Sequence, residues 1–237
     1  LLHQEFFEEL AGSRLLRRGE QRFGLALFND ASVVEHHNAV GFLHRGQAVG
    51  NHARRHQFVP SHPMAGTENS GPTAAISGLF DHKTAVICDP DQSGAEHLDR
   101  VTRMYQTLRM RLISLSSIEH DLHTAYVSHL SHISSFVLAN TVLAKEKNTR
   151  TIFDLAGGGF ESTVRLAKSS PEMWAPIFEQ NQSHVVEALE AYISHLKVFH
   201  QSLVNRDFDQ SKELMRDANR IRSVLADLQA RKEPQSR

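Results

Sequence analysis

The sequence of 237 residues is poor in the features that mark several classes of protein. Its single cysteine, Cys88, excludes an intramolecular disulfide and favours a reducing compartment such as the cytoplasm. Its formal net charge of −1 gives no electrostatic reason to expect nucleic acid or an anionic membrane as a partner. No apolar run approaches the roughly 20 residues that a membrane-spanning helix needs. We therefore expect a cytoplasmic protein without nucleic-acid or membrane partners.

The chain also lacks the glycine-rich G-x-G-x-x-G turn that receives the diphosphate of a dinucleotide in many α/β proteins. Residues 1–57 hold six of the 16 histidines and have no clean alternation of strand, turn and helix. The sequence begins with Leu1 rather than methionine, so we expect a fragment or a processed product. These observations make residues 1–57 an atypical segment.

From residue 58 the pattern is regular. Thr84-Ala-Val-Ile-Cys88 is rich in β-branched residues and ends at Asp89-Pro90, as a buried strand does. Residues 94–110 place apolar side chains at steps of three and four, which predicts an amphipathic helix. Residues 111–116 again favour a strand. This order predicts that residues 58–117 are the end of an α/β domain.

The remaining sequence predicts helices alone. Ser116 and Glu119 have the spacing of a capping box that opens a long, unbroken helix over about 118–145. Further helices are predicted over 160–168, from Ser170-Pro171 to about 205 with a kink at Pro176, and over 208–231. Residues 118–231 are thus expected to form an all-helical bundle or dimer interface, followed by a frayed tail at 232–237.

The segment His62-Pro-Met-Ala-Gly-Thr-Glu-Asn-Ser-Gly71 carries the first candidate for chemistry. Pro63 disfavours the helical conformation for His62 and places it in extended chain, as at the end of a strand that enters a loop. Ligands bind at such loops in open α/β sheets. His62 is therefore a candidate for proton transfer, and ordinary loop rigidity is the alternative explanation of the His-Pro step.

The predicted long helix contains two His-x-x-His pairs, His120 with His123 and His129 with His132. Imidazoles three residues apart can share a metal ion. At 3.6 residues per turn, however, His129 would lie on the opposite side of the helix from His120, so one ion cannot collect both pairs. A structural metal, histidines in the core or in solvent, and polar contacts to a buried ligand all stay open as explanations, and we assign no metal.

Gly157-Gly-Gly159 and the following residues suggest a site for an anion. Glycines let the backbone approach a ligand, and Arg165 can bind a carboxylate through two parallel hydrogen bonds. A flexible turn followed by a surface arginine explains the same residues. Trp174 is the only tryptophan, and a lone tryptophan more often fills a core or an interface than contacts a ligand.

Taken in order, these motifs resemble the prephenate dehydrogenase family, which includes the arogenate dehydrogenases. The resemblance covers about residues 58–205 and rests on the segment at His62, on His120-Asp121, on Ser128-His129-Leu-Ser-His132 and on Gly-Gly-Gly-Phe with Arg165 and Trp174. It implies the end of a Rossmann-type nucleotide-binding domain followed by a helical dimerisation domain. The implied reaction is the NAD- or NADP-dependent oxidative decarboxylation of prephenate to 4-hydroxyphenylpyruvate, in tyrosine biosynthesis.

The resemblance also implies roles for individual residues. His62 matches the catalytic histidine, which takes the proton of the ring hydroxyl as hydride leaves the same carbon. The implied substrate-binding residues are Thr67, Glu68, His129, His132, Gly158, Arg165 and Trp174. A homodimer through the helical domain is implied as well, whereas no cofactor-binding residue is assigned.

Two departures from the family pattern bear on function. Ser131 stands where the family has proline, and serine is better tolerated in a helix than proline. Family members also carry a much longer segment, with a dinucleotide fingerprint, ahead of the His-Pro-Met-Ala-Gly motif. We hypothesise that residues 1–57 are foreign to the family and joined near Gln57-Phe58. The alternative to an enzyme is a non-catalytic helical module that dimerises or binds the substrate through the same residues.

Overall fold

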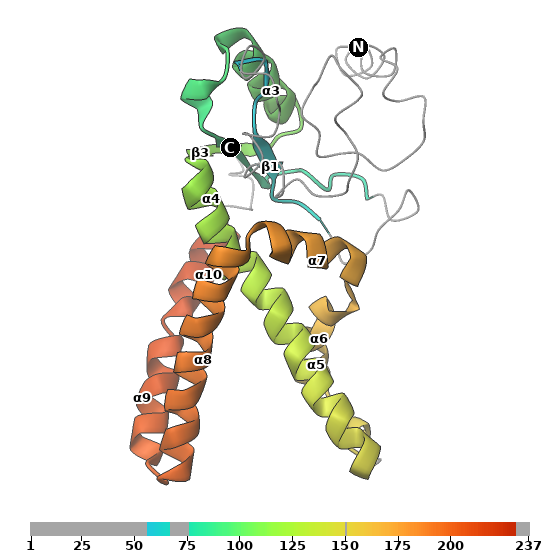
Figure 1. Cartoon of the computed structure of the whole chain (residues 1–237), viewed down its shortest axis with the longest axis vertical. Coiled ribbons are helices and arrows are strands. Elements are labelled where there is room, and N and C mark those ends of the chain that lie inside the picture. Colours follow the sequence, from blue (N-terminus) through green and yellow to red (C-terminus); the bar gives the residue numbers. More distant parts are fainter. Residues whose placement is uncertain (1–55, 67–75, 150, 231–237) are drawn as a thin grey trace. The chain divides into compact units, whose positions relative to one another are not determined.

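The structure is a computed structural model that describes residues 56–66, 76–149 and 151–230 (Figure 1). The chain divides into two compact units, Leu1–Gln182 and Ser183–Arg237. The first unit holds a small sheet and the helices that carry the candidate site. The second consists, in its described part, of most of one long helix and two shorter ones.

A three-stranded sheet forms the start of the described chain. The strands β1 (Ser61–Pro63), β2 (Thr84–Cys88) and β3 (Arg111–Leu115) lie in the order β1-β2-β3. Strand β1 is antiparallel to β2, and β2 is parallel to β3. His62 pairs with Val86, which confirms the extended conformation predicted from the His-Pro step.

Helix α3 (Ala95–Thr107) connects the two parallel strands and covers the sheet. Its apolar face supplies Val101 and Tyr105 to a core that also contains Val59, Ala85, Ile87 and Met110. The Tyr105 hydroxyl lies 2.9 Å from the Ser61 hydroxyl, which ties the helix to β1. The predicted strand–helix–strand order is confirmed. This is the expected end of an α/β nucleotide-binding domain, and the rest of the described chain is helical.

A long helical run begins at the predicted capping box. The Ser116 hydroxyl accepts from the Glu119 amide, and the Glu119 carboxylate accepts from the Ser116 amide at 2.9 Å. Helix α4 (Ser117–Thr124) starts there and α5 (Leu130–Thr149) ends the run. Between them Ala125–His129 form a π-helical turn, which we call the π-turn. The prediction of an unbroken α-helix over 118–145 was wrong at this turn.

The chain returns through three shorter helical segments. Helix α6 (Gly158–Val164) leads into a 3₁₀ turn (Arg165–Lys168), and α7 (Pro171–Gln180) follows. The Ser170 side chain caps α7, as its sequence predicts. Pro176 lies inside α7, and the helical run ends at Asn181, so the break is five residues beyond the predicted kink.

The second unit is helical throughout its described residues. Helix α8 (Gln182–Val204) is followed by α9 (Phe208–Ala218) and α10 (Ile221–Ala230), so the single helix predicted over 208–231 is in fact two. A hydrogen bond of 2.9 Å between the hydroxyls of Ser202 and Ser211 joins α8 to α9. Exposed apolar side chains in this unit include Ile193, Leu196, Val198, Leu203, Phe208, Val224 and Leu225.

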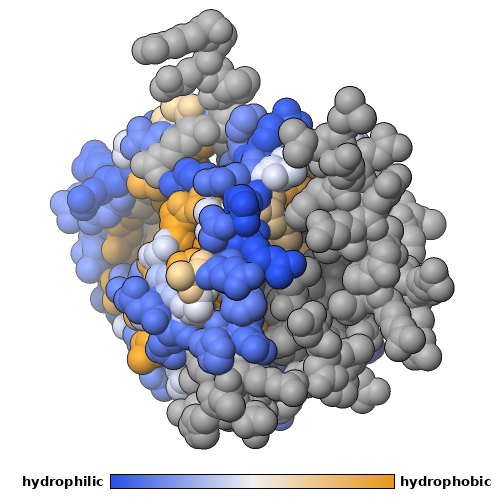
Figure 2. Space-filling model, turned by 90° about the horizontal axis from the view of Figure 1, so that it is seen from above, coloured by the Kyte–Doolittle hydropathy of each residue, from blue (hydrophilic) through white to orange (hydrophobic). Residues whose placement is uncertain are grey.

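In the view of Figure 2, hydrophilic residues cover much of the described surface, and apolar side chains show between them. Helices α8, α9 and α10 are amphipathic, so their apolar faces would be expected to be buried. Many apolar side chains on these faces are nevertheless exposed. None of the described helices combines the length and the hydrophobicity needed to cross a membrane.

Candidate active site

His62 is the half-buried centre of the site, at the middle of β1. Its Nδ1 atom lies 2.9 Å from Nε2 of His120 on α4, and the two rings meet edge to face with centroids 5.2 Å apart. The sheet and the long helical run therefore meet at a hydrogen bond between two imidazoles.

The second nitrogen of His120 faces a carboxylate. Its Nδ1 atom lies 3.0 Å from Oδ1 of Asp121, and both side chains are almost fully buried. Because a carboxylate only accepts, the proton of His120 belongs on Nδ1, and its Nε2 atom accepts from Nδ1–H of His62. The lone pair of His62 is then on Nε2. The series Asp121–His120–His62, which we call the relay, thus leaves a basic nitrogen at its end.

Burial lowers the pKa of His62 from its usual 6.5 to about 4, and the neighbouring His120 and His129 add to this effect while Asp121 opposes it. The imidazole is accordingly neutral at pH 7. A neutral imidazole with an oriented lone pair is suited to accept a proton from a substrate hydroxyl.

His129, at the end of the π-turn, is 1% exposed and lies edge to face with Trp174 at 5.9 Å. Burial lowers its pKa to about 4, with smaller effects from Asp121, His120 and His132. The expectation that His129 faces away from His120 was wrong. A π-turn holds more residues per turn than an α-helix, so the side chains after it are rotated back toward the buried side.

His132 and Trp174 stack with ring centroids 3.6 Å apart. The Nδ1–H of His132 donates to the Ser128 carbonyl at 3.0 Å, which leaves Nε2 available. Burial lowers the pKa of His132, the Ser128 bond opposes this, and the nearby Arg165 lowers it further. The structure thus brings His132, Arg165 and Trp174 to one region.

Trp174 is buried in a small apolar cluster with Ile177, next to Phe136 and Phe178. Its indole Nε1 is buried without a hydrogen-bond partner among the described residues. An unpaired buried donor is costly, so this atom is a candidate contact for a polar ligand group. Gly158 is exposed at the start of α6, and Thr67 and Glu68 lie outside the described residues.

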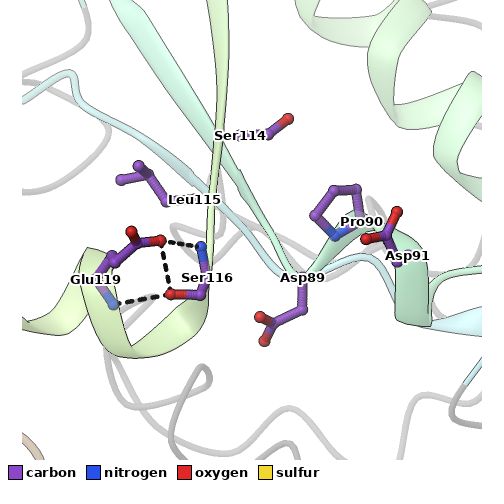
Figure 3. A pocket seen from close by; sticks show the side chains of 7 residues that line it. All are labelled: Asp89, Pro90, Asp91, Ser114, Leu115, Ser116 and Glu119. Carbon is purple, nitrogen blue, oxygen red and sulfur yellow. Dashed lines mark hydrogen bonds between the residues drawn. The ribbon is translucent and has the colours of Figure 1, made fainter.

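A pocket of about 270 Å³ lies at the carboxyl ends of β2 and β3 (Figure 3). It is lined by Asp89, Pro90, Asp91, Ser114, Leu115, Ser116 and Glu119. Ligands of open α/β sheets bind at this edge of the sheet. In the described parts of the chain no three or more metal-ligating side chains converge on a point where an ion could bind.

Two models of one protein family match the chain in succession. The nucleotide-binding domain of prephenate dehydrogenase matches residues 45–114, and the dimerization domain of prephenate dehydrogenase matches residues 116–217. The chain belongs to the prephenate dehydrogenase family. Strands β2 and β3 with α3 are therefore the end of the family's nucleotide-binding domain, and α4 to α9 belong to its dimerization domain.

Individual family members agree with this assignment. The chain is 30% identical to the cyclohexadienyl dehydrogenase of Zymomonas mobilis over 171 residues, 72% of this chain and 58% of that protein. It is 28% identical to the prephenate dehydrogenase of Bacillus subtilis over 142 residues, 60% of this chain and 38% of that protein. The chain thus spans between about two fifths and three fifths of the length of these relatives.

Solved structures of the family have the same fold. The prephenate dehydrogenase of Aquifex aeolicus, crystallised with hydroxyphenyl propionate and NAD⁺, superposes with a TM-score of 0.65 at 28% identity, over 70% of this chain and 58% of that one. The arogenate dehydrogenase of Synechocystis gives a TM-score of 0.63 at 23% identity, over 75% of this chain and 66% of that one, and supports the fold alone.

The pocket of Figure 3 fits part of the family's dinucleotide. Its carboxylates and hydroxyls, at Asp89, Asp91, Ser116 and Glu119, can hydrogen-bond the ribose hydroxyls and the carboxamide of a nicotinamide nucleoside. Among the described residues that line it none is cationic, and no glycine-rich turn adjoins it. The described part of this family member therefore suits the nucleoside end of the cofactor and not its diphosphate.

Sequence reasoning did not assign a role to three buried polar residues of the site, His120, Asp121 and Asn181. His120 and Asp121 are adjacent members of a motif, but the partner that joins them to the site is His62, which bonds His120 and lies 58 residues away from it. Asn181 carried no sequence signal, because its contacts depend on how α7 folds back onto α4.

Proposed function

We propose that this chain is a prephenate dehydrogenase-like oxidoreductase, which converts prephenate to 4-hydroxyphenylpyruvate and CO₂ with NAD or NADP in tyrosine biosynthesis. The observation that carries the proposal is the relay, whose hydrogen bonds of 3.0 and 2.9 Å leave Nε2 of His62 as a free base. The names of the relatives, prephenate and cyclohexadienyl dehydrogenase, support the reaction class.

In this proposal Nε2 of His62 accepts the proton of the ring hydroxyl while the hydroxyl-bearing carbon loses a hydride. When bound, the nicotinamide cofactor supplies the hydride acceptor. The carbon–carbon bond to the ring carboxylate then breaks and CO₂ leaves. Its electron pair makes the ring aromatic, and the resulting phenolate oxygen takes the proton back from His62 to give the hydroxyl of the product. Asp121 holds His120 in the tautomer that accepts from His62, and this interaction stabilises His62 as it gains its proton.

The substrate carboxylates are proposed to bind on the helical side of the site. Arg165 supplies the guanidinium, beside the available Nε2 of His132. The buried, unpaired Nε1 of Trp174 supplies a further donor. Gly158, His129, Thr67 and Glu68 complete the proposed substrate-binding set, and the pocket at Asp89 and Glu119 is proposed to bind the nucleoside end of the cofactor.

We also propose a homodimer through the helical part of the chain and a cytoplasmic location. The match of residues 116–217 to a dimerization domain and the exposed apolar side chains of α8 and α9 support the dimer. The family match begins at residue 45, and residues 1–55 lie outside the described residues. The foreign origin of residues 1–57 and the boundaries at 58–117 and 118–231 stay predictions.

The proposal is tested by mixing the purified chain with prephenate and NAD⁺ or NADP⁺ and following the absorbance of the reduced nicotinamide. We expect turnover that His62→Gln abolishes and that His123→Gln, an exposed neighbour on α4, leaves intact. Turnover of arogenate instead of prephenate would change the assigned substrate. Binding of hydroxyphenylpropionate or prephenate without turnover, in the presence of either cofactor, would show a non-catalytic module and overturn the proposal.

A further inference from the structure

Asn181 is a buried polar residue between α7 and α8. The residue is only 3% exposed. Its backbone N–H donates to the Ile177 carbonyl and so caps the carboxyl end of α7. A buried amide group is costly unless its hydrogen bonds are satisfied. The partners of its side chain therefore indicate why asparagine stands here.

The side-chain Nδ2 of Asn181 contacts both sides of the π-turn. It donates to the Asp121 backbone carbonyl at 2.8 Å, just ahead of the turn, and lies 3.3 Å from Nδ1 of His129 at its end. The opposite orientation of the amide would set its oxygen against the Asp121 carbonyl, so the nitrogen must face this carbonyl. Both protons of the amide nitrogen then point at acceptors, and Nδ1 of His129 is one of them.

This contact decides which nitrogen of His129 carries the proton. Because Nδ1 accepts, the proton of the neutral ring is on Nε2. A second proton on Nδ1 would face the amide protons of Asn181, so Asn181 opposes the charged form. The titratable groups around His129 are Asp121 and His120 on α4, His132 on α5 and His62 on β1. A charge on His129 would repel a proton arriving at His62.

We propose that Asn181 is a positioning residue of this site. It stabilises the π-turn that directs His129 to the side of the relay, and it keeps His129 neutral with its proton on Nε2. The inference about the tautomer rests on the geometry of Asn181 alone, whereas its consequence for proton transfer to His62 rests on the proposed function.

The test is a long-range ¹H–¹⁵N NMR spectrum of the histidine rings of the full chain, which distinguishes protonated from unprotonated ring nitrogens. His129→Gln assigns the signals. We expect wild-type His129 to keep Nδ1 unprotonated from pH 8 to pH 5. In Asn181→Asp the carboxyl oxygen accepts instead, so Nδ1 should become protonated and the pKa of His129 should rise by roughly one to three units.

Asn140→Asp, which places the same change on the exposed face of α5, is the matched control and should leave the His129 signals unchanged. A wild-type spectrum with the proton on Nδ1 of His129 would overturn the proposal, even if Asn181→Asp failed to fold. An unchanged tautomer in a folded Asn181→Asp would overturn it too. Because neither readout uses turnover, a chain without dehydrogenase activity would count against the proposed function and leave this test intact.

Discussion

His62 and His120, 58 residues apart in the sequence, share a hydrogen bond of 2.9 Å between Nδ1 and Nε2. The other nitrogen of His120 is held by Asp121 at 3.0 Å. A carboxylate that orients an imidazole is a common way to fix a tautomer and to stabilise a ring that gains a proton. Here Asp121 acts on the proposed base, His62, through the imidazole of His120. The proposed base therefore depends on a carboxylate that does not itself contact the substrate.

Replacing Asp121 by asparagine tests the relay. The amide nitrogen that Asp121→Asn introduces can donate to His120 Nδ1, which moves the His120 proton to Nε2, where it opposes Nδ1–H of His62. We expect kcat/KM to fall by roughly 10² to 10⁴, since general-base catalysis contributes that much, while KM changes little. Asp99→Asn, which removes an exposed carboxylate paired with Arg103, is the control. Equal loss in both variants would contradict the relay.

The pH dependence of activity gives a second prediction. His62 accepts a proton only when neutral, and burial together with His120 and His129 lowers its pKa to about 4. We therefore expect log kcat/KM to stay level as the pH falls through 6.5 and to drop only as it approaches about 4. Steady-state rates between pH 8 and pH 4 check this. An acid limb centred near 6.5, the value of a solvent-exposed histidine, would exclude His62 as a base in this environment.

Stability should depend on pH for the same reason. His62 and His129 have pKa values near 4 in the folded chain and near 6.5 when unfolded. The unfolded state thus binds more protons between these values. The stabilisation is complete above pH 6.5, and it decreases as the pH falls toward 4, by about 1.4 kcal/mol per pH unit for each histidine.

Urea unfolding followed by the fluorescence of Trp174, which is buried in the same unit, measures this dependence. His129→Gln should have a shallower slope than the wild type below pH 6.5, and the two slopes should agree above pH 7. If the stabilities of His129→Gln and the wild type changed in parallel over the whole pH range, His129 would titrate alike in the folded and unfolded states, which would contradict the prediction.

Much of the fold could be predicted from local patterns. The strand at 84–88, helix α3, the capping box at Ser116 and the start of α7 at Ser170 each follow from a few neighbouring residues. The π-turn could not be predicted, because residues 125–129 carry no local signal for it and its contact with Asn181 joins residues 52 positions apart. Without it, a regular helix places His129 on the wrong side.

The substrate-carboxylate assignment predicts a difference between arginine and lysine. Arg165→Lys keeps the charge but loses the planar pair of donors that grips a carboxylate. We expect KM for prephenate to rise about 10- to 100-fold, the loss of roughly 1.4 to 3 kcal/mol that one charge-assisted hydrogen bond can supply, with a smaller change in kcat. Lys168→Ala removes an exposed cation of the same 3₁₀ turn and serves as control. If Lys168→Ala raised KM as much, general electrostatic attraction would explain the effect.

The exposed apolar side chains of α8 predict the association state. Leu196, 51% exposed on α8, lies within the segment that matches a dimerization domain. If a second copy covers this face, Leu196→Glu buries a charge at the interface, which costs several kcal/mol unless the charge is paired. We expect sedimentation at micromolar concentration to give a dimer for the wild type and a monomer for Leu196→Glu. Ser194→Glu adds the same charge to an exposed site on the same helix. A wild-type monomer would refute the dimer, and dissociation by both variants would implicate net charge rather than the apolar face.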